Sequence, residues 1–168
     1  MPKRAPRQPR AARPKFAPGY GVPKTTKELK TWAWFGEQFE KSRNYWIGST
    51  KPDGAPHAAP VWGLWIDGAF YFSTDRASRK GKNLARDPLV VVHLESGDEV
   101  CILEGTVAEV KSQPVLKKFV MAYAKKYAMK EEDLVEVVKT GVVYTVIPSA
   151  AFAWLEKDFV TSVTRWSF

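Results

Sequence analysis

The chain has 168 residues, of which 45% are hydrophobic and 13% aromatic, so it is long and apolar enough to bury the core of one domain. Its formal charge is +8, yet residues 1–24 hold seven cations and no acid, whereas the remainder holds 19 cations and 18 acids. This nearly neutral remainder argues against a nucleic-acid partner. Because the sequence lacks both an apolar stretch of about 18 residues and the apolar stretch of a signal peptide, we expect no membrane partner and a cytoplasmic protein.

Residues 1–24 also contain six of the twelve prolines and few large apolar side chains. Such a segment cannot recover the entropy lost on ordering, so we predict a disordered basic tail over 1–24 and a single domain over 25–168. The single cysteine, Cys101, excludes an intrachain disulfide and any cysteine-based metal cluster. With only His57 and His93 to add, no metal site is predicted.

The rest of the chain predicts short strands with helices between them. In chain order these are a helix over 25–42, strands over 45–50, 56–65 and 69–73, a helix over 78–87, strands over 89–94 and 100–110, helices over 112–127 and 131–139, and strands over 142–147 and 150–155. Six or seven mostly antiparallel strands with added helices predict a small α+β barrel, mainly β. Closure into a barrel removes strand edges that would otherwise be exposed.

Basic side chains lie where the helix over 78–87 is predicted to begin. Cations are unfavourable there, because the N-terminus is already the positive end of the helix dipole. A bound phosphate would resolve the conflict by contacting the free backbone amides and five side chains, namely Ser73, Thr74, Ser78, Arg79 and Lys80. The alternative is a solvated basic face that Asp75 and Asp87 partly neutralise.

A second unusual feature is Pro60, which with Val61 and Trp62 lies inside a predicted strand. Proline cannot donate a ladder hydrogen bond, so we predict that one backbone edge is free of a strand partner. A flat heteroaromatic ring would fit such an edge, with its polar atoms bound by backbone groups and its face covered by Trp62. The alternative is an edge strand with ordinary core tryptophans.

The order and spacing of these segments resemble the split-barrel superfamily of pyridoxamine-phosphate-oxidase-like flavin and deazaflavin oxidoreductases. The resemblance is carried by residues 44–50, 52–57, 60–62, 70–74, 78–80 and 83–84, and more weakly by 164–168. It implies a split β-barrel that forms a homodimer, with two cofactor sites at the subunit interface and a small-molecule substrate. The cofactor-binding residues expected from it are Pro60, Val61, Trp62, Ser73, Thr74, Ser78, Arg79, Lys80, Asn83, Trp154, Arg165 and Trp166.

Departures from the family narrow the expected activity. True pyridoxamine-phosphate oxidases carry an arginine and a lysine where this chain has Ala59 and Leu64, and they end in an arginine-rich segment, so vitamin B6 oxidation is not expected. Without those cations the anionic reduced FMN is expensive to bury. The pattern therefore resembles more closely the branch that uses the deazaflavin coenzyme F-420, in which FMN users also occur. We expect hydride transfer between F-420 or FMN and a small organic acceptor, with His57 and Tyr71 as candidate proton donors beside solvent.

Two alternatives remain. The same barrel would serve a non-catalytic flavin- or tetrapyrrole-binding protein, because hydride chemistry belongs to the cofactor and not to the fold. A β-barrel that binds single-stranded nucleic acid through exposed tryptophans is disfavoured by the neutral domain. The basic tail would suit the acidic oligoglutamate tail of F-420 by charge, or would act only as a solubilising extension.

Overall fold

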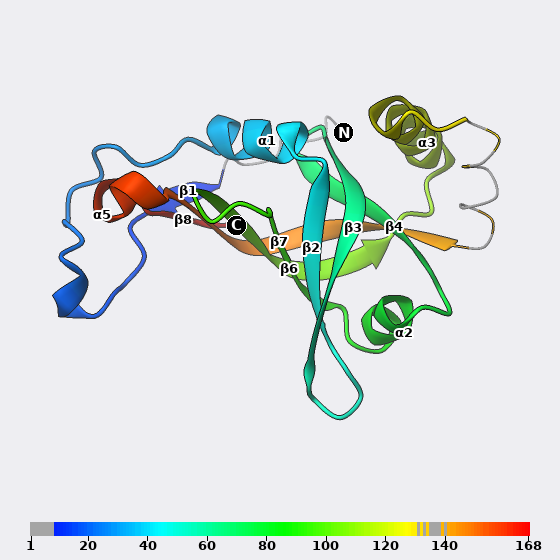
Figure 1. Ribbon diagram of the computed structural model, residues 1–168, viewed down its shortest axis with the longest axis horizontal. Coiled ribbons are helices and arrows are strands. Elements are labelled where there is room, and N and C mark those ends of the chain that lie inside the picture. Colours follow the sequence, from blue (N-terminus) through cyan, green and yellow to red (C-terminus); the bar gives the residue numbers. More distant parts are fainter. Residues whose placement is uncertain (1–8, 131, 133, 135–138, 140) are drawn as a thin grey trace, which may run out of the picture.

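The computed structural model describes residues 9–168 except 131, 133, 135–138 and 140 (Figure 1). Within these residues eight strands form one antiparallel sheet in the order β1-β8-β7-β4-β3-β2-β5-β6. Pairing of β6 with β7 closes six of them into a barrel, and β8 and β1 extend the sheet beyond β7. The predicted α+β barrel is confirmed.

The bounds of most elements agree with the sequence analysis to within two residues. The strands are β1 (Arg10–Ala12), β2 (Asn44–Thr50), β3 (Pro56–Ile66), β4 (Ala69–Asp75), β5 (Leu89–His93), β6 (Glu99–Glu109), β7 (Gly141–Leu155) and β8 (Thr164–Ser167). The helices are α1 (Trp32–Lys41), α2 (Arg79–Arg86), α3 (Gln113–Tyr127) and α5 (Phe159–Ser162), with 3-10 turns η1 (Pro18–Tyr20) and η2 (Glu156–Asp158). The two strands predicted over 142–155 are one strand, β7, whose pairing with β6 shifts register between Glu104 and Gly105. Most of the helix predicted over 131–139 lies outside the described residues.

The N-terminal segment departs from the expected disorder. Residues 10–12 form β1 and pair with β8, which adds a strand to the sheet. The Arg13 guanidinium donates to the carbonyl oxygens of four residues at 2.5 to 3.0 Å, namely Thr25, Lys27, Thr161 and Val163. Backbone pairing and a charged anchor therefore order a segment that has little apolar surface of its own.

Helix α1 begins later than the sequence predicted. Thr31 is its N-cap, since Oγ1 of Thr31 accepts the backbone N–H of Trp34 at 3.1 Å. The preceding Lys30 N–H donates to Oγ1 of Thr164 at 2.8 Å, which holds this part of the chain against β8. Glu28 has a φ of 68°, which a right-handed helix does not allow, so residues 25–28 stay outside the helix.

Aromatic side chains fill the barrel and its α1 cover. Phe35 and Phe39 from α1 meet Tyr45, Phe70 and Phe72 from the strands, and all five are fully buried. Burial of each such side chain contributes about 1.5–3 kcal/mol to folding. A second, smaller core joins α3 to the outer side of β3 and β7. No helix within the described ranges is long and apolar enough to cross a bilayer.

The hairpin formed by β2 and β3 extends beyond its pairing with the two neighbouring strands, β4 and β5. β3 pairs with β4 only from Gly63 to Ile66, and β2 pairs with β5 only from Trp46 to Gly48. Beyond these points the hairpin projects as a two-stranded arm, with α2 near its base (Figure 1). The place where β3 and β4 diverge, residues 56–62 of β3 and 73–75 of β4, is called the fork below.

Candidate functional site

The free strand edge that Pro60 predicted is present at the fork. From Pro56 to Trp62, β3 is paired with β2 on one side, with Pro60 opposite Trp46. On its other side the pairing with β4 begins only at Gly63, so the edge has no strand partner among the described residues. This prediction is confirmed. The exposed edge offers backbone N–H and C=O groups to a ligand.

The start of α2 lies directly after the end of β4 and is tightly built. Oγ of Ser78 caps the helix by accepting the N–H of Gly81 at 3.0 Å, and it donates to the carbonyl of Asp75 at 2.7 Å. Because Ser78 has one hydroxyl proton, Oγ1 of Thr74, 3.1 Å away, must donate to Ser78. A Cβ on Gly81 would lie 2.3 Å from the Asp75 carbonyl oxygen, so only glycine fits there.

Two cations occupy the first turn of α2. Arg79 is exposed and Lys80 half-buried, and neither has a hydrogen bond or ion pair to another described residue. Burial lowers the pKa of the Lys80 ammonium. The nearby acids form no ion pair with these cations among the described residues; Asp75 accepts the N–H of Ala77 and Asp87 accepts that of Leu89. These contacts weigh against a self-neutralised basic face and favour an anion site.

Three buried polar atoms near the fork have no hydrogen-bond partner among the described residues: Nδ1 of His57, Oγ of Ser73 and Oδ1 of Asn83. Asn83 is almost fully buried, and its Nδ2 donates to Oγ of Ser49 at 3.1 Å. Ser49 also lies opposite His57 in the β2–β3 register. A buried unpaired polar atom costs about 1–3 kcal/mol, so such atoms mark places where a ligand or water completes the structure.

The structure divides the predicted phosphate-binding side chains. Successive side chains of a strand point to opposite faces, so Ser73 and Thr74 cannot both face one phosphate. Thr74 lies with Ser78 beside α2, whereas Ser73 pairs with Val143, whose side chain belongs to the core beneath α3. The structure therefore groups Thr74, Ser78, Arg79 and Lys80 at the start of α2 and leaves Ser73 on the other face.

The remaining predicted residues take four positions. Val61 and Trp166 are core residues, the latter 1% exposed. Pro60 and Trp62 are exposed on the outer side of β3. Trp154 and Arg165 lie on β7 and β8, where the Arg165 guanidinium lies 5.8 Å from the centre of the Phe152 ring. Tyr71 is half-buried against the α3 core and pairs with Leu64 of β3.

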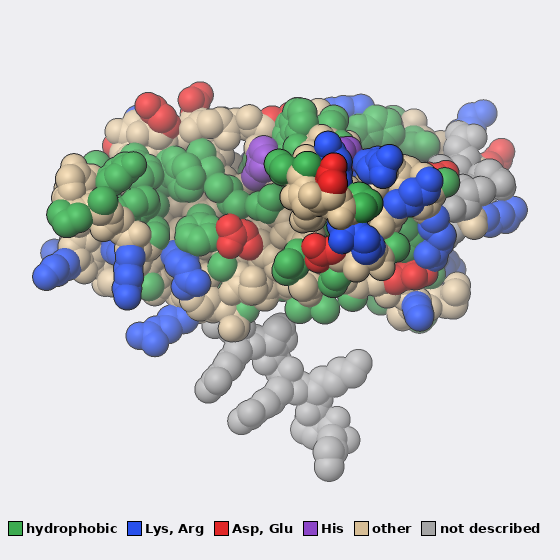
Figure 2. All heavy atoms as spheres, turned by 90° about the horizontal axis from the view of Figure 1, so that it is seen from below, with side chains coloured by type: hydrophobic (Ala, Val, Ile, Leu, Met, Phe, Trp, Pro, Cys, Tyr) green, Lys and Arg blue, Asp and Glu red, His purple; other side chains and the backbone are tan. Residues whose placement is uncertain are grey.

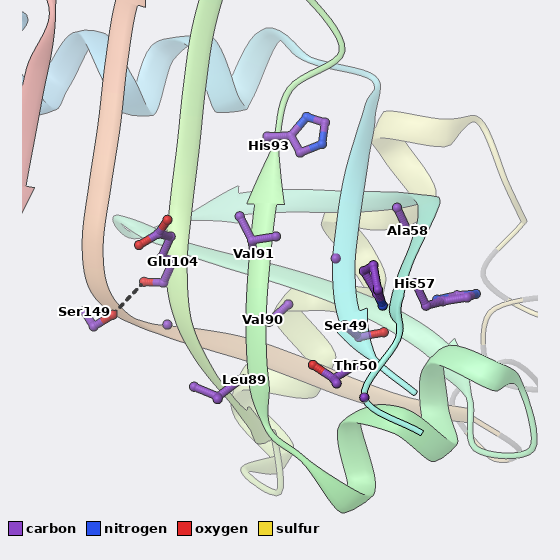
Figure 3. Close-up of a pocket in the computed structure, with 14 residues that line it drawn as sticks. Ser49, Thr50, His57, Ala58, Leu89, Val90, Val91, His93, Glu104 and Ser149 are labelled. Atoms are coloured by element: carbon purple, nitrogen blue, oxygen red, sulfur yellow. Dashed lines mark hydrogen bonds between the residues drawn. The ribbon is translucent and has the colours of Figure 1, made fainter. Parts of the chain in front are cut away.

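A pocket that the sequence analysis missed lies on the opposite side of the hairpin, where β2 diverges from β5 (Figure 3). It has a volume of about 580 Å³, and the residues that line it include Ser49, His57, Val91, His93 and Glu104. The one sequence feature that could have pointed to the pocket is a glycine inside a strand, Gly48, where a Cβ would lie 2.4 Å from Cγ1 of Val91. No recognisable motif accompanies it. No described group of His, Cys, Asp and Glu could hold a metal ion.

Comparison with solved structures shows a common fold. A conserved hypothetical protein from Mycobacterium tuberculosis is 24% identical with a TM-score of 0.67, the match covering 78% of this chain and 88% of that one. An F-420 reductase is 18% identical with a TM-score of 0.53, over 68% of this chain and 94% of that one. A heme storage protein from Vibrio cholerae is 9% identical with a TM-score of 0.56, over 69% and 86%.

No curated protein sequence matches the chain. The family model for pyridoxamine 5'-phosphate oxidase, however, matches residues 35–157. This match spans most of the barrel, including the free edge of β3 and the start of α2. The chain therefore belongs to the pyridoxamine 5'-phosphate oxidase family of split-barrel proteins.

Proposed function

We propose that this protein is an oxidoreductase that uses F-420 or FMN to transfer a hydride to or from a small organic acceptor, with the cofactor bound at the fork. The observation that carries the proposal is the pairing of a free β3 edge with the unneutralised cations Arg79 and Lys80 at the start of α2. The free β3 edge suits the polar edge of a flat ring, and the two cations suit a phosphate. F-420 and FMN each contain both groups.

The proposed roles follow from the contacts. Lys80 and the first amides of α2 would hold the phosphate, while Thr74 and Ser78 fix the helix start that presents them. The backbone of residues 56–62 would bind the polar edge of the ring. A reduced flavin or deazaflavin supplies the hydride when bound, so the chain has to orient the acceptor and exclude water.

The proton that accompanies the hydride has one candidate at the fork. His57 lies on the free-edge strand, and its Nδ1 is buried without a partner. Tyr71 packs against the α3 core and pairs with Leu64, two residues beyond the free edge. We therefore propose His57 or solvent as the proton donor.

We further propose that a second copy of the chain completes the site. Outward-facing positions of an antiparallel sheet are normally polar, yet Val91, Ile102, Phe152 and Trp154 occupy such positions. Figure 2 shows apolar side chains gathered on the underside of the molecule, with Lys and Arg along its margin. β7 and β8 carry Trp154 and Arg165 away from the fork of the same chain, so these residues would reach a cofactor only across a dimer interface.

The test is a titration of purified protein with F-420 and, separately, with FMN, followed by the fluorescence anisotropy of each cofactor at low and high salt. We expect saturable binding of F-420 that weakens with salt, because the phosphate site is cationic. Tighter binding of FMN would assign the flavin instead. Binding of neither, with binding of a tetrapyrrole such as biliverdin, would overturn the proposal in favour of a non-catalytic carrier.

The same samples show whether the protein forms a dimer. Light scattering coupled to size-exclusion chromatography should give about twice the 18.9 kDa mass of one chain. A monomer that still binds cofactor with full affinity would contradict the shared site. Turnover with an added electron acceptor then separates an enzyme from a binding protein.

A further inference from the structure

At the end of the fork lie four side chains to which the proposed function gives no role. Trp62 is the last residue of the free β3 edge, and it lies against Tyr127 at the end of α3 and Arg43 before β2. Lys126, also at the end of α3, lies beside the Tyr127 ring. We call these four residues the shelf. Its exposed surface is the indole of Trp62, which is 38% exposed although its ring belongs to a stacked pair.

Hydrogen bonds to the β3 backbone fix the shelf. The Tyr127 hydroxyl accepts the N–H of Gly63 at 2.8 Å, and it lies 2.9 Å from the Gly63 carbonyl and 2.8 Å from the Arg43 carbonyl, to either of which it donates. The indole of Trp62 stacks on the Tyr127 ring with centroids 4.4 Å apart and planes 5° from parallel. Tyr127 therefore covers one face of the indole and the Tyr123 ring lies 6.2 Å away at an angle of 54°, while the exposed part of Trp62 is accessible to a ligand.

Two cations lie beside this aromatic stack, Arg43 next to both rings and Lys126 next to Tyr127. The Arg43 guanidinium lies 5.6 Å from the ring centres of both Trp62 and Tyr127. The Lys126 ammonium donates to the Tyr45 hydroxyl at 2.7 Å and to the Gly63 carbonyl at 3.2 Å, which leaves one of its three protons for another acceptor.

The shelf has more positive charge than its surroundings neutralise. Burial and the charge of Arg43 lower the pKa of Lys126 to about 8, against a smaller opposing effect of Glu40. Neither cation forms an ion pair with an acid among the described residues. An anion bound here would gain charge-assisted hydrogen bonds and would relieve the repulsion between the two cations.

A partly exposed indole near two unneutralised cations suits a flat conjugated ring that carries a carboxylate. We propose that the shelf binds such a planar organic anion as the hydride acceptor. This inference rests on the proposed function, because Trp62 ends the strand edge at which the cofactor ring is proposed to lie. The acceptor would then stack on Trp62 with its carboxylate toward Arg43 and Lys126.

The test compares trans-cinnamate with the uncharged trans-cinnamamide by isothermal titration calorimetry on the purified protein. We expect the carboxylate to bind about tenfold more tightly, since a hydrogen bond to a charged group contributes about 1.5–3 kcal/mol. Arg43→Gln should abolish this preference. Lys125→Gln, which removes an exposed cation one position from Lys126, should keep it. Equal binding of the two compounds to the wild type, or an unchanged preference in Arg43→Gln, would overturn the proposal.

Cofactor titrations of the same variants separate this inference from the proposed function. Unchanged F-420 or FMN affinity in Arg43→Gln, together with loss of the cinnamate preference, supports the shelf as an acceptor site. A protein that binds neither cofactor but prefers cinnamate through Arg43 would overturn the acceptor role and leave an anion site. Loss of cofactor affinity in Arg43→Gln would place Arg43 in the cofactor site and contradict the shelf.

Discussion

The two sides of the β2–β3 hairpin show that the size of a hollow does not identify a binding site. On the β5 side lies a pocket of about 580 Å³, lined by small, apolar and neutral polar residues together with His93, one acid, Glu104, and His57, which lies on the strand shared with the fork. On the β4 side lies the fork, which has a free strand edge, a helix N-terminus and the cations Arg79 and Lys80. Unneutralised charge and free backbone groups favour the fork as the cofactor site.

The largest expected effect comes from Gly81, where a Cβ would lie 2.3 Å from the backbone oxygen of Asp75. Gly81→Ala must displace α2 from the end of β4, and overpacking of this kind costs about 1–3 kcal/mol. We expect it to abolish cofactor binding at the fork while the barrel remains folded by circular dichroism. On the pocket side, the Cβ of Gly48→Ala would meet only a Val91 side-chain atom at 2.4 Å, so cofactor should still bind. An equal loss of cofactor affinity in Gly81→Ala and Gly48→Ala would contradict the assignment of the cofactor to the fork and not to the pocket.

A smaller effect is expected from Asn83, which joins α2 to the hairpin through Ser49. Asn83→Ala should lower the free energy of unfolding by about 1–3 kcal/mol, because it removes a buried hydrogen bond and leaves a void. Urea denaturation with and without saturating cofactor measures this loss. If Oδ1 of Asn83 binds the cofactor, the increase in the free energy of unfolding that saturating cofactor produces should be smaller in Asn83→Ala than in the wild type. An equal increase in both proteins would show that Asn83 has only a structural role.

Lys126 gives a pH-dependent prediction. Burial, followed by the charge of Arg43, lowers its pKa from 10.5 to about 8, while Glu40 opposes the shift. Between these two pH values the unfolded chain holds a proton on Lys126 that the folded chain has released, so stability rises with pH across this window. Urea titrations at pH 7.5 and 9.5 should show a smaller rise for Lys126→Met than for Lys125→Met. The same rise in both variants would contradict the shifted pKa.

The smallest effect is expected on the pocket side. Glu104 is exposed there and forms no ion pair within the described part of the chain. Glu104→Gln should leave the affinity for F-420 or FMN within about twofold, because it keeps the size of a side chain that pairs with Val91 on the proposed dimer face and changes nothing at the fork. A much larger change in cofactor anisotropy titrations would move the cofactor from the fork to the pocket.

Local chemistry predicted part of this arrangement correctly. The free edge at Pro60 follows from the missing N–H of proline, and the start of α2 follows from the capping preference of Ser78. The separation of Ser73 from Thr74 was also available from strand alternation. It was missed because the predicted strand ended at Ser73, whereas β4 continues to Asp75.

Contacts between distant residues account for what the sequence did not predict. β1 is ordered by pairing with β8 and by Arg13, whose guanidinium reaches carbonyl oxygens almost 150 positions away. The segment before α1 is bound by Thr164, and the pocket depends on where β2 and β5 stop pairing. None of these contacts has a local motif, so periodicity and capping rules could not reveal them.

The most direct test of the fork as the cofactor site is the affinity of Lys80→Gln for F-420 and FMN, measured beside Lys82→Gln. Both variants lose one cation from α2, but Lys80 is half-buried at the helix start and Lys82 is exposed. We predict that Lys80→Gln weakens binding of the preferred cofactor about tenfold or more and lessens its salt dependence, while Lys82→Gln changes little. Equal affinities for the two variants and the wild type would contradict a phosphate site at the start of α2.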